Sequence, residues 1–164
     1  MEQSETMDST QEEHVLSAAD ATLTTSRALL GIIARSVSSA LEEVTLPQFR
    51  VLVILAGSGA MRIGALAARM KAVPSTFSRT IDRMVAEGWV ERAASVENRR
   101  EVIIDVTSKG WRLVHGATEL RRREIADVLA TMSKKDRNAV ASALSKFSVA
   151  AGEPADDDLL GLGL

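Results

Sequence analysis

The sequence predicts a mainly α fold of the α+β class, in which one β-hairpin interrupts a series of helices. Apolar residues recur at helical spacing from Ser17 onward and again after Thr107. Between these two regions, period-two alternation follows Gly88 in two short runs, as expected for strands. Apolar residues make up 46% of the chain but aromatic residues only 3%, so the core must consist of aliphatic side chains. A length of 164 residues fits one domain.

The composition excludes several classes of protein. The chain has no cysteine, so disulfide frameworks, thiolate metal sites and thiol redox sensing are ruled out. Its acidic, polar beginning differs from a secretory signal, which needs a basic start and an apolar run. No apolar stretch approaches the ~18 residues of a membrane span. We therefore expect the protein to be cytoplasmic.

The net charge of −2 conceals a basic middle segment. Residues 1–61 carry three basic and eight acidic side chains, and residues 113–164 carry seven and eight. Residues 62–112, in contrast, carry ten Lys or Arg against six acids. A basic segment between acidic flanks suggests a local surface that binds a polyanion, although such a surplus is also common on a solvated surface.

The first half of the chain contains two predicted helices after a disordered start. We expect residues 1–14 to be disordered because they are polar, acidic and lack an apolar period. Residues 17–44 have the spacing of a first helix. Thr45 followed by Gln48 fits a capping box for a second helix, which should end in the glycine-containing stretch 57–59.

Two further helices precede the hairpin. Residues 62–70 predict a short helix, and Pro74 opens the next one, which Gly88 ends. Apolar residues at i, i+4, i+7 and i+8 give this fourth helix one buried face. The residues expected to point inward are Ile63, Leu66, Ala67 and Met70 on the third helix and Phe77, Ile81, Met84 and Val85 on the fourth.

The hairpin and the last two helices complete the fold. Residues 89–93 and 101–107 read as strands on either side of a polar tip. Thr107 can cap a long helix that runs to about Ala130. Ser133, three residues before an Asp, opens a last helix that ends near residue 150.

A short helix, a tight turn, a second helix and a β-hairpin form the order of a winged helix-turn-helix. The major groove of B-DNA admits one α-helix, whose first turns meet base edges and phosphates. We therefore predict DNA binding by the outer face of the fourth helix and by the hairpin tip, where Arg can enter the minor groove. The predicted contacts are Ser75, Thr76, Ser78, Arg79, Arg83, Arg99 and Arg100. The alternatives are a solvated helix face with an ordinary cap and a charged turn kept soluble by its arginines.

Three segments carry a family resemblance. LPQFRVL, IGALAARMKAVPSTFSRTIDRMVAEGWVER and NRREVIIDVTSKG resemble, in order and spacing, the MarR family of multiple-antibiotic-resistance regulators. The resemblance covers about residues 17–150. Its most specific part is the wing pattern Asp-x-Arg, five residues, Leu-Thr, two residues, Gly. This pattern reads here as Asn98, Arg100, Val106, Thr107 and Gly110.

The wing departs from the family pattern at its acidic position. The resemblance implies that an Asp orients the wing arginine through an ion pair, and Asn98 stands in its place. The orientation therefore falls to a neutral hydrogen bond or to one of two neighbouring acids, Glu97 or Glu101. The resemblance also implies that Arg92, at the end of the first wing strand, braces the wing.

The resemblance implies an obligate homodimer in which the first and the last two helices interleave. Independent support comes from the terminal helices, which carry more apolar surface than a monomer of this size can hide. Two-fold symmetry predicts a roughly palindromic operator on double-stranded DNA. The expected seam is Leu113, Val114, Leu120, Val128, Leu129, Val140, Leu144 and Phe147. The expected division is a disordered segment 1–14, a domain 15–150 (dimerisation helices 17–44 and 112–150, winged helix-turn-helix 46–110) and a flexible acidic tail 151–164.

Many MarR-like proteins bind small aromatic or phenolic acids between the dimer helices and the winged part. By this resemblance the candidate lining residues are Arg27, Phe49 and Arg50. The alternative, which we favour, places Phe49 in the core and Arg50 at the surface as an ion-pair partner.

The other candidate residues give little evidence for a functional site. His14 and His115 stand far apart, with no cysteine or carboxylate cluster, so no metal site is expected. The run 121–123 of three arginines reads as a solvated helix face, and Trp89 and Trp111 as core or boundary residues. No nucleophile–base pair, glycine-rich phosphate loop or carboxylate pair points to an enzyme or a cofactor.

The sequence therefore predicts a homodimeric, sequence-specific DNA-binding transcriptional regulator, acting as a repressor and released by a small aromatic or phenolic ligand. The alternative is a winged-helix protein-interaction module that has lost DNA binding. Asn98 and the overall acidity support this alternative.

Overall fold

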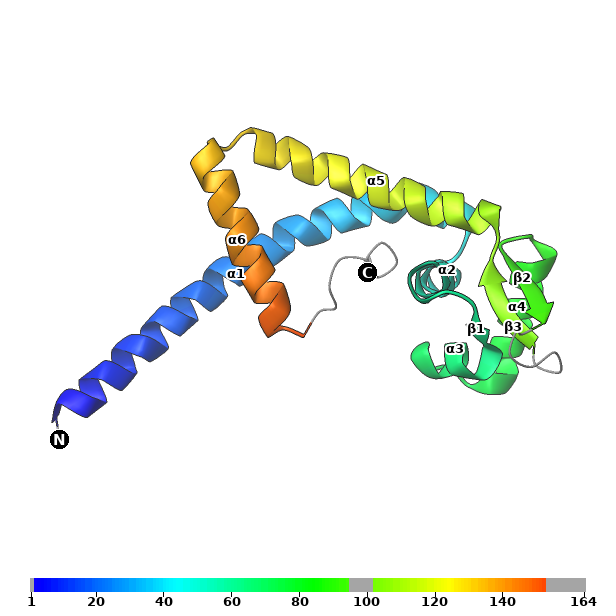
Figure 1. The fold of residues 1–164 in the computed structure, drawn as a ribbon, viewed down its shortest axis with the longest axis horizontal. Coiled ribbons are helices and arrows are strands. Elements are labelled where there is room, and N and C mark those ends of the chain that lie inside the picture. Colours follow the sequence, from blue (N-terminus) through cyan, green and yellow to red (C-terminus); the bar gives the residue numbers. More distant parts are fainter. Residues whose placement is uncertain (1, 95–101, 153–164) are drawn as a thin grey trace.

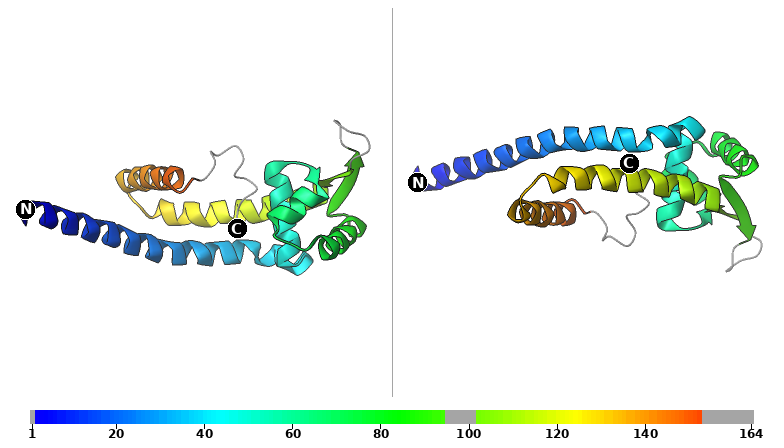
Figure 2. Two further views of the ribbon diagram at one scale, coloured as in Figure 1. Left: turned by 90° about the horizontal axis from the view of Figure 1, so that it is seen from below. Right: turned by 90° about the horizontal axis from the view of Figure 1, so that it is seen from above.

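The computed structural model describes the backbone of residues 2–94 and 102–152, and the side chains of 10–73, 76–94 and 102–152. Two long helices, α1 (Glu2–Glu43) and α5 (Ser108–Ala130), lie side by side (Figures 1 and 2). A smaller part made of α2 to β3, the winged lobe (residues 46–106), sits at one end of this pair. The last helix, α6 (Lys134–Ala150), turns away from α5 and overlaps α1 only in the projection of Figure 1.

Helix α1 is longer than the sequence predicted. It begins at Glu2, so residues 2–14, expected to be disordered, are helical. No Gly or Pro occurs before Gly31, so no residue in this stretch breaks the helix. Polarity alone is therefore a poor guide to disorder here, because Glu and Gln are polar and yet have good helix propensity.

Charged and polar contacts join α1 to α5. Arg35 forms an ion pair with Glu124 at 2.6 Å. Arg121 Nε donates a hydrogen bond of 3.3 Å to the hydroxyl of Ser36, which is fully buried. Burial lowers the pKa of the Arg121 guanidinium below its ordinary value. The prediction that residues 121–123 form a solvated face is therefore wrong for Arg121, whereas the other two arginines are exposed.

Helix α2 (Leu46–Ser58) has the predicted caps. The amide of Thr45 donates to Gln48 Oε1 at 2.8 Å, and Gln48 N donates to the Thr45 hydroxyl at 3.5 Å, which completes the capping box. The helix ends at Gly59, whose φ of 73° suits glycine. Six of its residues are buried, so it forms the centre of the lobe.

The helix-turn-helix consists of α3 (Ile63–Arg69) and α4 (Pro74–Ala86). A short strand that the sequence did not predict, β1 (Met61–Arg62), precedes α3. Gly88, with φ 75°, turns the chain from α4 into the hairpin of β2 (Val90–Ala94) and β3 (Val102–Val106). The three strands form an antiparallel sheet in the order β1-β3-β2.

The core of the lobe follows the predicted stripes. Leu66 and Ala67 of α3 and Phe77, Ile81 and Met84 of α4 are buried as expected. The inward residues Ile63, Met70 and Val85 are half-buried against the same core.

Positions were also expected for two tryptophans and a valine near this core. Trp89 is buried, as expected, whereas Trp111, expected in the core or at its boundary, is 40% exposed. Val114, expected in a dimer seam, is also buried in this core, because the first turns of α5 pack on α2 and β3.

Gly110 marks the closest approach of α5 to the lobe. A Cβ at this position would lie 2.5 Å from the carbonyl oxygen of Trp89 and 2.8 Å from Val106 Cγ2. Both distances are shorter than a real Cβ contact allows, so only glycine fits here. This is the physical reason for a glycine three residues after Thr107, whose hydroxyl accepts the amide of Gly110 at 3.2 Å.

Replacing Gly110 with Ala is expected to lower the free energy of unfolding by about 1–3 kcal/mol, because the new methyl group forces α5 away from backbone that cannot yield. Gly116→Ala is the matched control on the same helix, where an added Cβ meets nothing within 4 Å. This variant should gain up to about 1 kcal/mol from helix propensity. Urea unfolding at equal protein concentration compares the two, and equal stability of both variants would contradict the packing argument.

Candidate nucleic-acid interface

Helix α4 is anchored on the lobe by one face and exposes the other. The tight turn before it is closed by backbone hydrogen bonds from Met70, Lys71 and Ala72 to the carbonyls of α3. Lys71 takes a left-handed conformation there, with φ 50°. This turn sets the angle between α3 and α4 and so presents the outer face of α4 to solvent.

The predicted contact residues of α4 do not all share this outer face. Thr76, Arg79 and Arg83 are exposed and lie at i, i+3 and i+7, on one side of the helix. Ser78 is half-buried and lies about 200° around the helix from Thr76, next to the core side. The side chain of Ser75 lies outside the described residues.

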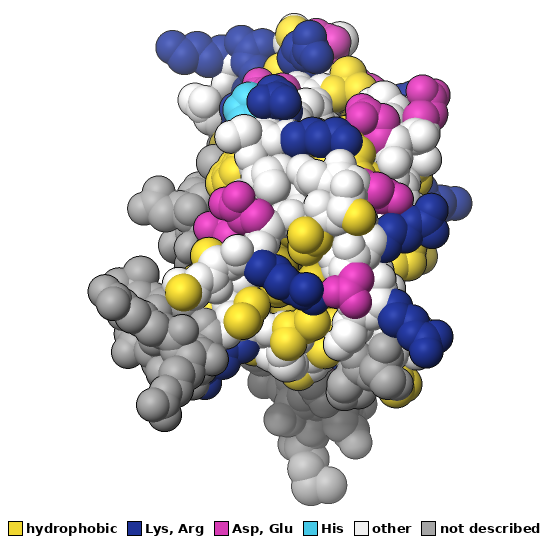
Figure 3. All heavy atoms as spheres, turned by 90° about the vertical axis from the view of Figure 1, so that its right-hand side faces the viewer, with side chains coloured by type: hydrophobic (Ala, Val, Ile, Leu, Met, Phe, Trp, Pro, Cys, Tyr) yellow, Lys and Arg dark blue, Asp and Glu magenta, His cyan; other side chains and the backbone are white. Residues whose placement is uncertain are grey.

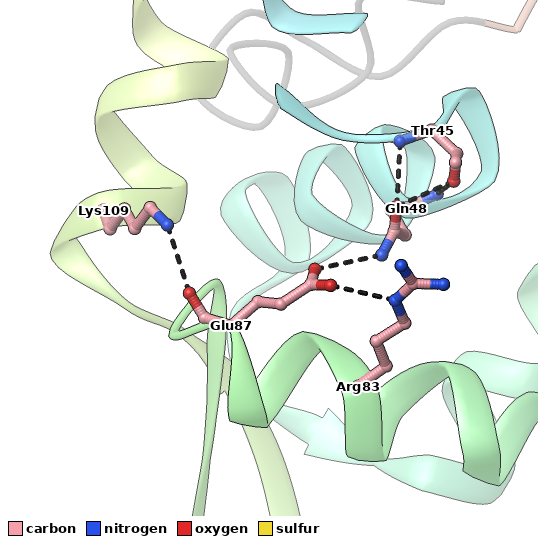
Figure 4. Close-up of polar contacts among 5 residues, drawn as sticks. All are labelled: Thr45, Gln48, Arg83, Glu87 and Lys109. Carbon is pink, nitrogen blue, oxygen red and sulfur yellow. Dashed lines mark hydrogen bonds and ion pairs between the residues drawn. The ribbon is translucent and has the colours of Figure 1, made fainter. Parts of the chain in front are cut away.

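A chain of polar contacts runs from Arg83 to the start of α2 (Figure 4). Arg83 Nε donates to Glu87 Oε1 at 2.9 Å. The second carboxylate oxygen of Glu87 accepts a long hydrogen bond of 3.5 Å from Gln48 Nε2. Lys109, in the first turn of α5, donates to the backbone carbonyl of Glu87 at 3.1 Å. This cluster could not be predicted from the sequence, because Gln48 and Lys109 lie 61 residues apart.

Arg92 connects the first wing strand to α4. Its guanidinium forms an ion pair with Asp82, which lies on α4. This contact joins β2 to α4, and the bracing role expected for Arg92 stays a prediction. The other predicted wing residues, Asn98, Arg99 and Arg100, lie outside the described residues.

Two acidic side chains at α4, Asp82 and Glu87, are paired with arginines. Asp82 faces Arg92 and Glu87 faces Arg83, whereas no ion pair among the described residues involves Arg79. This end of the molecule shows basic side chains separated by acidic and apolar ones (Figure 3). The surface is therefore mixed in charge, and it is not an acidic face.

The three candidate ligand-binding residues do not form one site in the structure. Arg27 is exposed on α1 and donates to Thr24 of its own helix at 3.4 Å. Phe49 is 1% exposed and packs in the core, which is the alternative favoured above. Arg50 is exposed beside it. A ligand would reach the Phe49 ring only by displacing core neighbours.

A hollow of about 300 Å³ lies where α1, the start of β2 and the first turns of α5 meet. We call it the junction hollow, and its lining residues are Glu43, Trp89, Lys109, Arg112 and Leu113. Lys109 Nζ lies 3.6 Å from the centre of the Trp89 ring, a cation–π contact. The sequence did not predict this site, because its cations come from α5 and its carboxylate from the end of α1.

Two kinds of site find no support in the part of the chain that the structure describes. No group of three or more His, Cys, Asp or Glu side chains is placed to hold a metal ion there. None of the described helices combines the length and hydropathy that a membrane span requires.

Comparison with known proteins shows which family this fold resembles. The sequence matches the MarR family over residues 44–102. An HTH-type transcriptional regulator of Mycobacterium bovis is 36% identical over 100 residues, which are 61% of this chain and 70% of that protein. The crystal structure of RV1404 from Mycobacterium tuberculosis is 38% identical, with a TM-score of 0.72, over 82% of this chain and 92% of that one. A MarR family protein from Bacillus stearothermophilus is 25% identical, with a TM-score of 0.69, over 87% and 98% of the two chains.

The chain therefore belongs to the MarR family. It is a transcriptional regulator with the helix-turn-helix DNA-binding fold of that family, and not an enzyme. This result confirms the fold class predicted from the sequence, a mainly helical winged helix-turn-helix.

Proposed function

We propose that two copies of this chain bind a roughly palindromic operator in the cytoplasm and repress transcription from it. Each copy places α4 in the major groove, and the half-sites lie about one helical turn apart. The observation that carries this proposal is the exposed stripe Thr76, Arg79 and Arg83, on a helix whose opposite face is fixed in the core.

The three side chains of this stripe suit different parts of DNA. Thr76 is short and stands in the first turn of α4, where close approach to base edges is possible. Arg79 is long and has no acidic partner among the described residues, so it is available for a guanine or a phosphate. Arg83 stands one turn farther along, where phosphate is the expected partner.

Arg79→Ala should weaken binding to the operator by about 1–3 kcal/mol and relax specificity at one position per half-site, because its guanidinium reads a base. Fluorescence anisotropy with DNA from upstream of its own gene, at several salt concentrations, measures this loss. Arg123→Ala, which removes an equally exposed cation from α5, is the control and should leave affinity unchanged. A uniform loss on all sequences would make Arg79 a phosphate contact, and equal binding of random DNA by the wild type would contradict specific recognition.

Homodimerisation is supported by apolar side chains that the monomer leaves exposed. No residue of α6 is buried, and Leu144 and Phe147 are 49% and 56% exposed. On α1, Leu16, Leu23 and Leu30 are also exposed and recur every seven residues, the repeat of a helix-pairing stripe. A two-fold partner that covers α6 and this stripe would bury both surfaces at once.

Phe147→Glu should convert the dimer into a monomer at micromolar concentration. Burial of one such side chain contributes about 1.5–3 kcal/mol, and symmetry doubles the loss in each dimer. Sedimentation equilibrium reports the mass directly. Val102→Glu, at a comparably exposed apolar residue on β3, is the control and should keep the wild-type mass. A monomeric wild type would contradict the proposed assembly.

A small aromatic or phenolic acid is proposed to release the protein from DNA. Such a ligand acts by binding better to one spacing of the two α4 helices than to another. The cleft between the dimer helices and the winged lobe would change shape with this spacing, and Arg27 and Arg50 are the cations proposed there, whereas Phe49 is buried in the core. The junction hollow offers two more cations, Lys109 and Arg112, at the same boundary.

Salicylate-like acids and hydrophobic drugs should displace bound DNA in an anisotropy screen, and Arg27→Ala or Arg50→Ala should weaken this displacement. Displacement that survives both substitutions but is lost in Arg112→Ala would assign the ligand to the junction hollow instead. A screen in which no compound displaces DNA would contradict regulation by this class of ligand.

A further inference from the structure

Glu87 is the residue at which three elements of the fold meet. Its carboxylate binds Arg83 of α4 through one oxygen and Gln48 of α2 through the other. Its backbone carbonyl accepts the ammonium group of Lys109 from α5. Its own amide donates to the carbonyl of Arg83 at 2.9 Å, which closes the last turn of α4. Figure 4 shows the carboxylate lying between Gln48 and Arg83.

Gln48 helps to fix the position of the Glu87 carboxylate. The Gln48 side chain is 7% exposed, and its Oε1 accepts both the amide and the hydroxyl of Thr45 at 2.8 Å. The capping box of α2 therefore fixes the amide group, and its remaining nitrogen points at Glu87. A buried amide nitrogen without a partner would be costly, so Gln48 favours the rotamer of Glu87 that reaches it.

The position of the Glu87 carboxylate in turn affects the Arg83 side chain. Its side chain is 75% exposed, and its described hydrogen bond uses only Nε. The guanidinium is planar, so holding Nε fixes the direction of both terminal amino groups. Arg83 itself lies on the same side of α4 as Thr76 and Arg79.

We propose that Glu87 is a positioning residue for DNA binding, which orients Arg83 so that its terminal amino groups meet a backbone phosphate. The inference rests on the proposed function, because it assigns a partner to Arg83 within the same interface. An isolated surface pair of this kind contributes little to stability. Its value here is preorganisation, since a side chain already held in place loses less freedom when it binds.

The sign of the effect separates this proposal from simple electrostatics. Glu87 is an acid near a surface that faces a polyanion, so removing its charge should strengthen DNA binding if charge alone matters. If Glu87 positions Arg83, the same substitution should weaken binding. The second effect also needs Arg83, whereas the first does not.

The experiment compares wild type, Glu87→Gln, Arg83→Ala and the double variant by anisotropy with operator DNA. Glu87→Gln should weaken binding about threefold per subunit and so about tenfold per dimer, the size expected of an exposed pair. In the Arg83→Ala background the same substitution should leave affinity unchanged or raise it. Glu119→Gln is the matched control, since Glu119 is 35% exposed like Glu87 and pairs with Arg122 on α5. It should bind DNA as the wild type does.

A second variant tests the contribution of Gln48. Gln48→Glu keeps an oxygen for the capping box but replaces the donor to Glu87 with a like charge. Thermal unfolding should occur at lower temperature in both backgrounds, because a carboxylate replaces a buried amide next to Glu87, while operator binding weakens more in the wild-type background than in Arg83→Ala. An equal loss in both backgrounds would overturn the assignment of Gln48.

The outcomes for the two proposals are distinct. Tighter binding by Glu87→Gln, or an equal loss with and without Arg83, overturns the positioning of Arg83 while specific DNA binding stands. Failure of the wild type itself to prefer its operator over random DNA overturns the proposed function.

Discussion

The first turn of α5 holds the three backbone carbonyls that follow α4, and the winged lobe is oriented by this contact. Lys109 Nζ binds the carbonyl of Glu87, the Thr107 hydroxyl donates to that of Gly88 at 2.7 Å, and the Thr107 amide donates to that of Trp89 at 3.2 Å. Gly110 lets the helix approach closely enough for all three bonds. Because α4 ends and β2 begins at these residues, a single contact fixes the recognition helix, the wing and a long helix relative to one another.

This arrangement makes α5 the route by which the two ends of the molecule influence each other. The same helix packs along α1 through Arg121 and Glu124, and its first turn is hydrogen-bonded to the winged lobe. A change in the angle between α5 and α1 would therefore carry α4 with it as a nearly rigid unit. The junction hollow lies beside this contact between α5 and the lobe, and Lys109 and Trp89 belong to both. A molecule that filled the hollow would touch two of the residues of this contact, Lys109 and Trp89.

Local features of the fold were predictable, because their causes lie within a few residues of sequence. The caps at Thr45, Thr107 and Ser133, and the glycine ends at Gly59 and Gly88, were each confirmed. Features that depend on distant partners were not. The strand β1 has two residues and no period, and it exists because Met61 pairs with Ile104. The partner of Arg121 lies 85 residues away, and the contact between Gln48 and Glu87 spans 39.

The charges of the lobe also depend on such pairing, and this changes what the composition implies. The surplus of basic residues over 62–112 suggests a broad basic patch, yet Arg92 and Arg83 are each bound to an acid. Paired charges attract a polyanion weakly at long range, and the whole chain carries a net charge of −2. The two pairs therefore make the long-range attraction of this segment to DNA weaker than its ten basic residues alone suggest, so the placement of the side chains left without an acidic partner, such as Arg79, matters more for binding.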